Sequence, residues 1–322
     1  MLHPYAQHKD LTADTLREVV ALRDQSIQIS KVKNIALHQT SRETVLIDDN
    51  PTPQSMKVIS KYLKAPAAFL SSADLPLAQY IVDHQLKKVK HDSEIVFRDG
   101  RAIGDQPAGS IRLSGSQIVD KMIAAAGQMR RGNFYDLGNY IDVSLVGDKI
   151  TMKPKLDDIT EGGLRCLYSE IMTRPPTLEP YVERLVCLNG MIVKDRIQAF
   201  QFDTMDQFLQ QFDTAASTAI QYVDTAIRAQ LQKAVDTKVE RSEQALRVIF
   251  ENQRLSPRML PAALAALAVE DDGSAFGVLQ AITRAANTMP YARRLSLQET
   301  GAKEMARLET VHCPTCWSTL TH

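Results

Sequence analysis

The chain has 322 residues, of which 44% are hydrophobic and 24% charged, which is ordinary for a globular protein large enough for two domains. Lys plus Arg and Asp plus Glu number 38 each, so the zero formal charge excludes a chain that is strongly basic throughout. Four cysteines exclude a disulfide framework, residues 1–10 lack the regions of a signal peptide, and the apolar run at 261–269 is too short to span a bilayer, so we expect a reducing cytoplasm.

The N-terminal region has mixed helix and strand patterns. Thr12 is placed to cap a helix that reaches about residue 23. Residues 26–37 and 43–48 have the composition of strands. Thr52-Pro53 predicts a second helix start, because proline is favoured in a first helical turn. A further helix is expected over residues 75–89, followed by basic residues that suit the negative end of its dipole.

The middle region, residues 94–155, is rich in β patterns and glycine turns. Strands are expected at 94–98 and 111–113, followed by a helix that Ser116 caps and Gly127 ends. Residues 140–146 and 149–155 alternate apolar and polar side chains around Gly147-Asp148, which predicts a hairpin. Residues 130–135 are expected to form a mobile turn. Residues 163–171 and 184–202 add further strand candidates.

After Thr204 the pattern becomes helical. Residues 205–240 predict a long helix with one break, and four shorter helices are expected at 242–253, 256–269, 274–289 and 297–308. Ser256-Pro257 and Ser274 are N-cap signals for two of them. The fold class is therefore α+β: a β-rich N-terminal and middle region with flanking helices, then a helical C-terminal half. We divide the chain into residues 1–203 for nucleic-acid binding, 204–310 for packing or self-association, and a tail at 311–322.

Cations and aromatic rings are interleaved along the middle region. Residues 84–155 hold 12 Lys and Arg against 8 Asp and Glu, whereas residues 203–309 hold 12 against 14. Cations that follow phosphates and rings that stack on unpaired bases are typical of single-strand binding. The candidate DNA-binding residues are Arg98, Arg101, Arg112, Arg130, Arg131, Phe134, Tyr135, Tyr140, Lys149, Lys153 and Lys155.

Structural explanations remain open for the same residues. Lys149, Lys153 and Lys155 are expected on one face of the strand, and Ile150 and Met152 on the opposite face. Lysines in such a row also protect edge strands from aggregation. Phe134 would be a core residue if the 130–135 segment were only a solvated loop.

Metal chemistry has two weak signals. His312, Cys313, Cys316 and His322 in the tail include a Cys-x-x-Cys zinc half-site, although an unliganded tail is the simpler interpretation. Adjacent carboxylates such as Asp48-Asp49 point apart and are typical of turns, so a metal-dependent nuclease is a minor alternative. We expect neither a cofactor nor an enzymatic activity.

Two family resemblances accompany these patterns. Residues 183–191, ERLVCLNGM, and residues 275–287, AFGVLQAITRAAN, resemble a broad phage and plasmid family whose function is unknown. In length, basic and aromatic middle region and helical C-terminal half, the chain also resembles the single-stranded DNA-binding RNA polymerase cofactors of schitovirus-type podoviruses. That resemblance carries over no individual residue. It implies a protein that coats single-stranded DNA in the bacterial host cell and recruits a phage-encoded RNA polymerase.

The expected function is therefore non-enzymatic DNA binding that supports transcription. A homo-oligomer is expected because single-strand binders gain avidity by assembling along the strand. A single-strand annealing or recombination protein is the alternative, since a β-hairpin groove would serve that function too, and a purely structural scaffold is the last.

Overall fold

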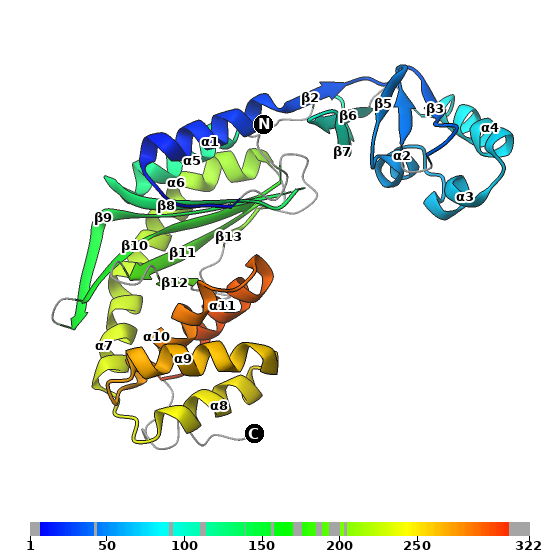
Figure 1. Ribbon diagram of the computed structural model, residues 1–322. Coiled ribbons are helices and arrows are strands. Elements are labelled where there is room, and N and C mark those ends of the chain that lie inside the picture. Colours follow the sequence, from blue (N-terminus) through cyan, green and yellow to red (C-terminus); the bar gives the residue numbers. More distant parts are fainter. Residues whose placement is uncertain are drawn as a thin grey trace.

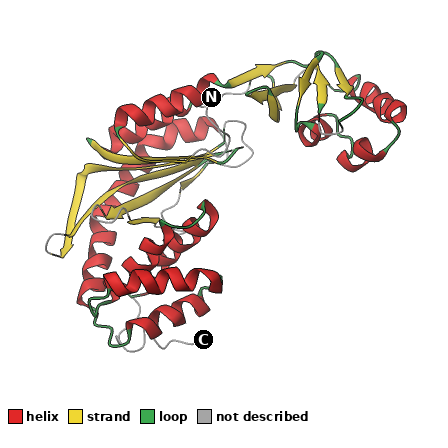
Figure 2. Ribbon diagram, in the orientation of Figure 1, coloured by secondary structure: helices red, strands yellow, loops and turns green. Residues whose placement is uncertain are grey.

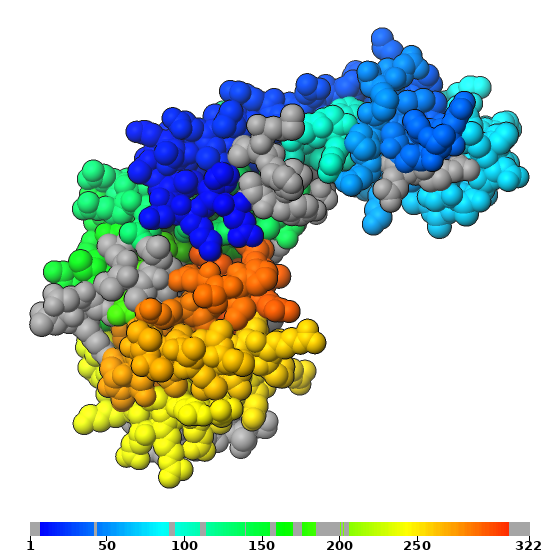
Figure 3. Space-filling model, viewed as in Figure 1, coloured from blue at the N-terminus to red at the C-terminus, as the bar shows by residue number. Residues whose placement is uncertain are grey.

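A computed structural model of the chain describes residues 7–41, 44–89, 93–109, 114–138, 140–155, 158–169, 176–184, 189–192, 200–202 and 205–308. It has a body, in which a large sheet lies between two groups of helices, and an arm that projects from one end of that body (Figure 1). The space-filling view shows the arm standing clear of the C-terminal helices (Figure 3). The α+β class predicted from the sequence is confirmed, with the helical part occupying the last third of the chain.

The body is built on a seven-stranded antiparallel sheet. Its strand order is β1-β8-β9-β10-β11-β12, with β13 also paired to β11. The strands are β1 (Gln7–Leu11), β8 (Met129–Asp136), β9 (Ile141–Lys155), β10 (Asp158–Tyr168), β11 (Thr177–Arg184), β12 (Asn189–Ile192) and β13 (Phe200–Gln201). Successive side chains of a strand point to opposite faces of the sheet, so each strand contributes side chains to both faces.

One face of the sheet is apolar and is covered by α1 (Ala13–Gln25), α5 (Gly115–Ala126) and α6 (Met205–Tyr222) (Figure 2). Thr12 caps α1 as predicted, because its side chain accepts a hydrogen bond from the Thr15 amide at 3.3 Å. Gly127 ends α5 at a φ of 87°, a conformation that favours glycine. Ile141, Val143 and Leu145 of β9 point into this core.

The arm comprises residues 27–107, inserted between α1 and α5. Its stem is the sheet of β2 (Ile27–Ser30), β6 (Ser93–Arg98) and β7 (Arg101–Pro107). Its head combines β3 (Ile35–Leu37), β4 (Val45–Ile47) and β5 (Asn50–Thr52) with α2 (Met56–Tyr62), α3 (Ala67–Ser72) and α4 (Leu75–Leu86). The head and the stem strands β6 and β7 share a hydrophobic core that is separate from the cores of the body. Gln79 joins α4 to β3, since its side chain accepts from the Leu37 amide at 2.8 Å and donates to the Ile35 carbonyl at 3.0 Å.

A buried ion-pair cluster joins the arm to the body. Asp136, at the end of β8, accepts from Arg23 of α1 at 2.7 Å and from Arg98 of β6 at 2.9 Å. Both guanidiniums also donate to the Gly138 carbonyl. Because Arg23 and Arg98 are 1% and 6% exposed, these contacts fix the strand of the arm's stem against the end of the sheet.

The C-terminal helices form a second large core beyond the sheet. They are α7 (Arg228–Asp236), α8 (Ser242–Asn252), α9 (Leu260–Glu270), α10 (Ala275–Ala286) and α11 (Tyr291–Arg307), with a 3-10 turn at Pro257–Met259. The break predicted in the long helix is a π-helical turn at Val223–Ile227, between α6 and α7. Ser274 caps α10 by accepting from the Gly277 amide, as its position predicted.

Four local predictions are wrong. Ser116 does not cap α5, because the helix already begins at Gly115 and Ser114 holds the N-cap position. Residues 130–135 are not a turn but part of β8, an inner strand of the sheet. Gly147-Asp148 is not a hairpin turn: it lies in a bulge of β9, where Val146 opposes Gly163 and Thr151 opposes Glu161. Thr52 ends β5 rather than starting a helix, because Asp48 and Asp49 adopt positive φ and turn β4 back into β5. The strand predicted at 111–113 lies outside the described residues.

Candidate functional site

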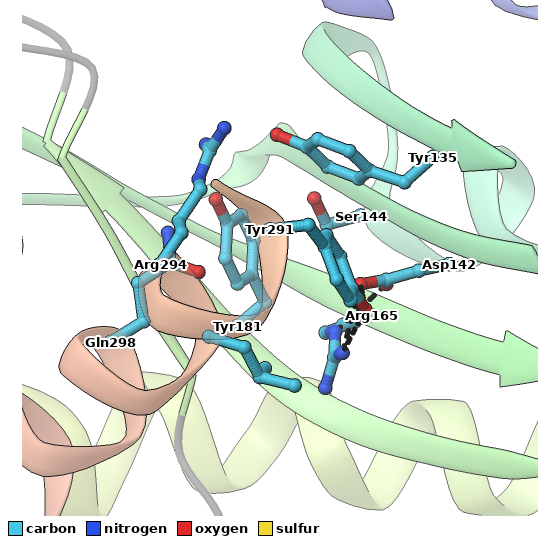
Figure 4. Close-up of a pocket in the computed structure, with 9 residues that line it drawn as sticks. Tyr135, Asp142, Ser144, Arg165, Tyr181, Tyr291, Arg294 and Gln298 are labelled. Atoms are coloured by element: carbon cyan, nitrogen blue, oxygen red, sulfur yellow. Dashed lines mark hydrogen bonds and ion pairs between the residues drawn. The ribbon is translucent and has the colours of Figure 1, made fainter. Parts of the chain in front are cut away.

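The face of the sheet opposite α1, α5 and α6 carries polar side chains, most of them buried. They come from four adjacent strands: Arg131, Asn133 and Tyr135 on β8, Asp142 and Ser144 on β9, Arg165 on β10, and Glu179, Tyr181 and Glu183 on β11. Helix α11 lies over this face and adds Tyr291, Arg294 and Gln298 (Figure 4). We call this set the polar face. Buried polar groups cost free energy unless they are hydrogen-bonded, so its bonding pattern shows which groups are available to a ligand.

Arg165 is the centre of a closed network. It is 1% exposed, and its guanidinium donates to both carboxylate oxygens of Asp142 at 2.8 Å and to Glu179 at 2.5 Å. The Tyr291 hydroxyl, from α11, donates to Asp142 at 2.5 Å. Burial, followed by the charge of Asp142, raises the pKa of Tyr291, so this hydroxyl stays a donor. The network is internally paired and holds α11 against the sheet.

Arg294 is bonded differently. It is 5% exposed and lies over the ring of Tyr135, with its guanidinium carbon 5.1 Å from the ring centre. Figure 4 shows this guanidinium pointing away from the Asp142–Arg165 pair. Four buried polar atoms near it have no hydrogen-bond partner among the described residues: Arg294 Nη1, Arg131 Nη1, Glu183 Oε2 and the Tyr135 hydroxyl. Burial raises the pKa of Glu183 to about 7, although Arg131 and Arg294 oppose the shift.

The predicted DNA-binding residues do not gather on one surface. Arg98 and Phe134 are buried, Arg98 in the Asp136 cluster and Phe134 at 0% exposure in the apolar core, so neither is available to DNA in this structure. Tyr135 is 4% exposed beneath Arg294. Lys149 donates to the last carbonyls of α5, at Ala124 and Ala125.

The remaining members of the predicted set are scattered. Arg101 on the arm, Arg130 on β8 and Lys153 on β9 are exposed, while Arg131 pairs with Asp10 at 3.2 Å and Tyr140 is half-buried. Arg112 and the side chain of Lys155 lie outside the described residues. The predicted alternation on β9 is confirmed at Ile150 and Met152, which are buried while Lys153 is exposed.

Sequence reasoning missed two features. Tyr291 and Arg294 reach the polar face from α11, but the predicted helix began at residue 297 and excluded both. The second is a stripe on the outer side of α4, formed by Leu77, Tyr80 and His84 and continued by Lys87 and Lys88, all of them exposed. Its spacing of three and four residues was visible in the sequence, but which face of α4 packs on the arm was not.

Other chemical candidates are limited in the part of the chain that the structure describes. No group of three or more His, Cys, Asp or Glu side chains there is arranged to hold a metal ion. The tail residues His312, Cys313, Cys316 and His322 lie outside it. Cys166 is buried in the apolar core, and burial raises the pKa of its thiol. None of the described helices has the length and apolar character needed to cross a membrane.

Comparison with models of known families, with curated proteins and with solved structures finds no match to this chain.

Proposed function

We propose that the protein binds single-stranded DNA without catalysing a reaction. The observation that carries the proposal is the outer stripe of α4 on the arm. Tyr80 is 64% exposed, and its ring stacks on that of His84 with centroids 6.1 Å apart and an interplanar angle of 9°. Leu77 is 49% exposed beside them, and Lys87 and Lys88 follow in the chain.

The chemistry of this stripe suits an unpaired strand. Exposed rings offer flat faces on which bases stack, and nearby ammonium groups neutralise phosphates. In a duplex the base faces are already covered by neighbouring pairs, so the rings gain little from contacting it. The arm holds α4 away from the C-terminal helices (Figure 1), which leaves the stripe open along its length.

The first test compares a single-stranded oligonucleotide with its duplex in gel shifts across salt. We expect Tyr80→Ala to weaken single-strand binding by about 1–3 kcal/mol and Tyr80→Phe to retain most of it, because stacking needs the ring rather than the hydroxyl. Equal affinity for the duplex, or equal binding by both Tyr80 variants and the wild type, would contradict the proposal.

The second test concerns charge. Replacing Lys87 and Lys88 together by Ala should make the log–log salt slope shallower by roughly 0.7 for each phosphate that the variant no longer neutralises. Lys238→Ala with Lys303→Ala is the matched control, since both side chains are exposed in the C-terminal helical region. A control pair that lowers the slope as much as the arm pair would mean that binding is not centred on α4.

We further propose that the bound protein recruits a phage-encoded RNA polymerase, which rests on the resemblance to schitovirus cofactors, and that it forms homo-oligomers through the helices after residue 204. Light scattering at micromolar concentration tests the oligomer, and binding of the polymerase to DNA-bound protein tests recruitment.

Faster pairing of complementary strands would instead favour the annealing alternative, and metal-dependent cleavage of a labelled strand would favour the nuclease.

A further inference from the structure

A cavity of about 160 Å³ opens beside the polar face. Lys9 and Asp10 of β1 line its exposed mouth, and Asn133, Glu183 and Arg294 line its buried part. Arg131 lies between them with a side chain that is 20% exposed. The cavity is therefore open to solvent at one end and surrounded by buried charged groups at the other.

Cations exceed anions in this cavity. Lys9, Arg131 and Arg294 supply three positive groups, whereas the carboxyl groups are Asp10, which pairs with Arg131, and Glu183. Among the described residues no carboxylate lies within ion-pair distance of Arg294 or Lys9. Partial burial, and then the charge of Arg294, lowers the pKa of Lys9, so the two cations lie close enough to repel each other.

The charged groups beside the cavity are incompletely hydrogen-bonded. Arg294 Nη1 and Arg131 Nη1 have no hydrogen-bond partner in the described part of the chain, and neither has Glu183 Oε2. Buried polar atoms are almost always hydrogen-bonded, and each exception needs an explanation. The guanidinium groups of Arg131 and Arg294 and the ammonium group of Lys9 surround one cavity, and such a set of cations forms a site for an oxyanion.

We propose that this cavity binds a phosphate group, with Arg131, Arg294 and Lys9 contacting its oxygens. A phosphate has enough oxygens and charge for all three cations, and the planar fork of a guanidinium matches it. Glu183 in its protonated form would donate to a further oxygen. The proposal does not rest on DNA binding by the arm, since a free phosphate would satisfy the same groups as a phosphorylated strand end.

Titration calorimetry with inorganic phosphate tests the site. Lys9→Ala and Arg131→Gln should each weaken binding about tenfold, because each removes a charged contact. Lys9 is exposed, so its variant should fold even if changes at buried Arg294 do not. Asp10→Asn should tighten binding by releasing Arg131, and Lys153→Ala, an exposed lysine outside the cavity, should leave it unchanged.

The pH response gives a second readout. Sulfate is the better probe here, because its charge is constant between pH 6 and pH 8 whereas phosphate groups titrate near that range. Glu183 is contacted by the Tyr181 hydroxyl and faced by Arg131, Arg294, Asp10, Tyr135 and, across the cavity, Lys9. Sulfate affinity should fall as Glu183 ionises with rising pH, and Glu183→Gln should remove that fall.

A pair of oligonucleotides identifies the source of the phosphate. Stronger binding of a strand with a 5′-phosphate than of the same strand with a 5′-hydroxyl, abolished in Lys9→Ala, would assign the site to a DNA end. Binding of inorganic phosphate without that difference would assign the site to a free phosphate or a small phosphate ester.

Absence of saturable binding by all of these probes, or variants at Lys9 and Arg131 that bind like the wild type, would overturn the proposal. Failure of the proposed DNA binding can be distinguished from failure of the phosphate site. It would appear as weak binding of the 5′-hydroxyl strand and as equal binding by the Tyr80 variants and the wild type.

Discussion

Phe134 and Tyr135 are neighbours on β8, yet they face opposite sides of the sheet and different chemistry. Phe134 joins an apolar core under α1 and α5, whereas Tyr135 lies among charged side chains under α11. Both sides are equally closed to solvent at these positions, with exposures of 0% and 4%. The difference shows that this sheet uses one face for burial of apolar surface and the other for a buried ionic network, whose stability depends on complete pairing.

The largest effect is expected from removing the centre of that network. Arg165→Ala should lower the free energy of unfolding by about 3–5 kcal/mol, because it leaves Asp142 and Glu179 buried without their cation. The loss should shrink in acid, where protonated carboxyl groups are cheaper to bury. Urea unfolding at two pH values measures both effects.

Leu145→Ala is the control on the apolar face. Leu145 is 0% exposed, and its truncation should cost about 2–5 kcal/mol at either pH, since no charge is involved. An Arg165 variant with the same pH-independent loss would mean that packing, rather than ion pairing, holds the polar face.

Glu183 should make stability fall with rising pH. Its pKa is raised by burial from 4.5 to about 7 in the folded chain, so between those values the folded state binds more protons than the unfolded state. Stability is then lost as pH rises through this window, by roughly 3 kcal/mol at most. Glu183→Gln should remove this loss, so the variant should gain on the wild type from pH 5 to pH 8.

The smallest effects compare the two neighbours on β8. Phe134→Tyr would bury a hydroxyl in the apolar core and should cost about 1–3 kcal/mol. Tyr135→Phe should change stability by no more than about 0.5 kcal/mol, because the hydroxyl it removes has no hydrogen-bond partner among the described residues. Thermal unfolding of both variants gives the comparison. A large loss from Tyr135→Phe would show that this hydroxyl is bonded after all.

Local sequence signals predicted much of the helical structure. Thr12, Ser274 and Gly127 sit at helix ends as expected, because capping depends on residues within one helical turn. Signals that depend on partner strands were less reliable. The segment 130–135 contains Gly132 and two arginines, a composition that favoured a turn, but pairing with β1 and β9 makes it a strand.

The candidate site also depends on contacts between distant segments, so the sequence predicted it poorly. The basic and aromatic residues between 94 and 155 form one group by composition, but their exposures range from buried Arg98 to exposed Lys153. Burial depends on contacts between distant segments, such as Arg98 with Asp136, which are 38 positions apart. The polar face combines side chains from β8 through α11, and no short motif in the sequence contains them.

The sequence by itself determined the α+β class, the helical end of the chain, the N-caps at Thr12 and Ser274, and the alternation of Ile150, Met152 and their neighbours. Periodicity and capping act over a few residues, so both can be predicted from a short segment. Only the tertiary structure decided that Arg165 is paired whereas Arg294 and Arg131 keep unbonded nitrogens beside a cavity. It also decided that Tyr80 and His84 stay exposed on the arm. These outcomes depend on which strands pair and which helix covers them, and long-range packing of that kind is not encoded in any single segment.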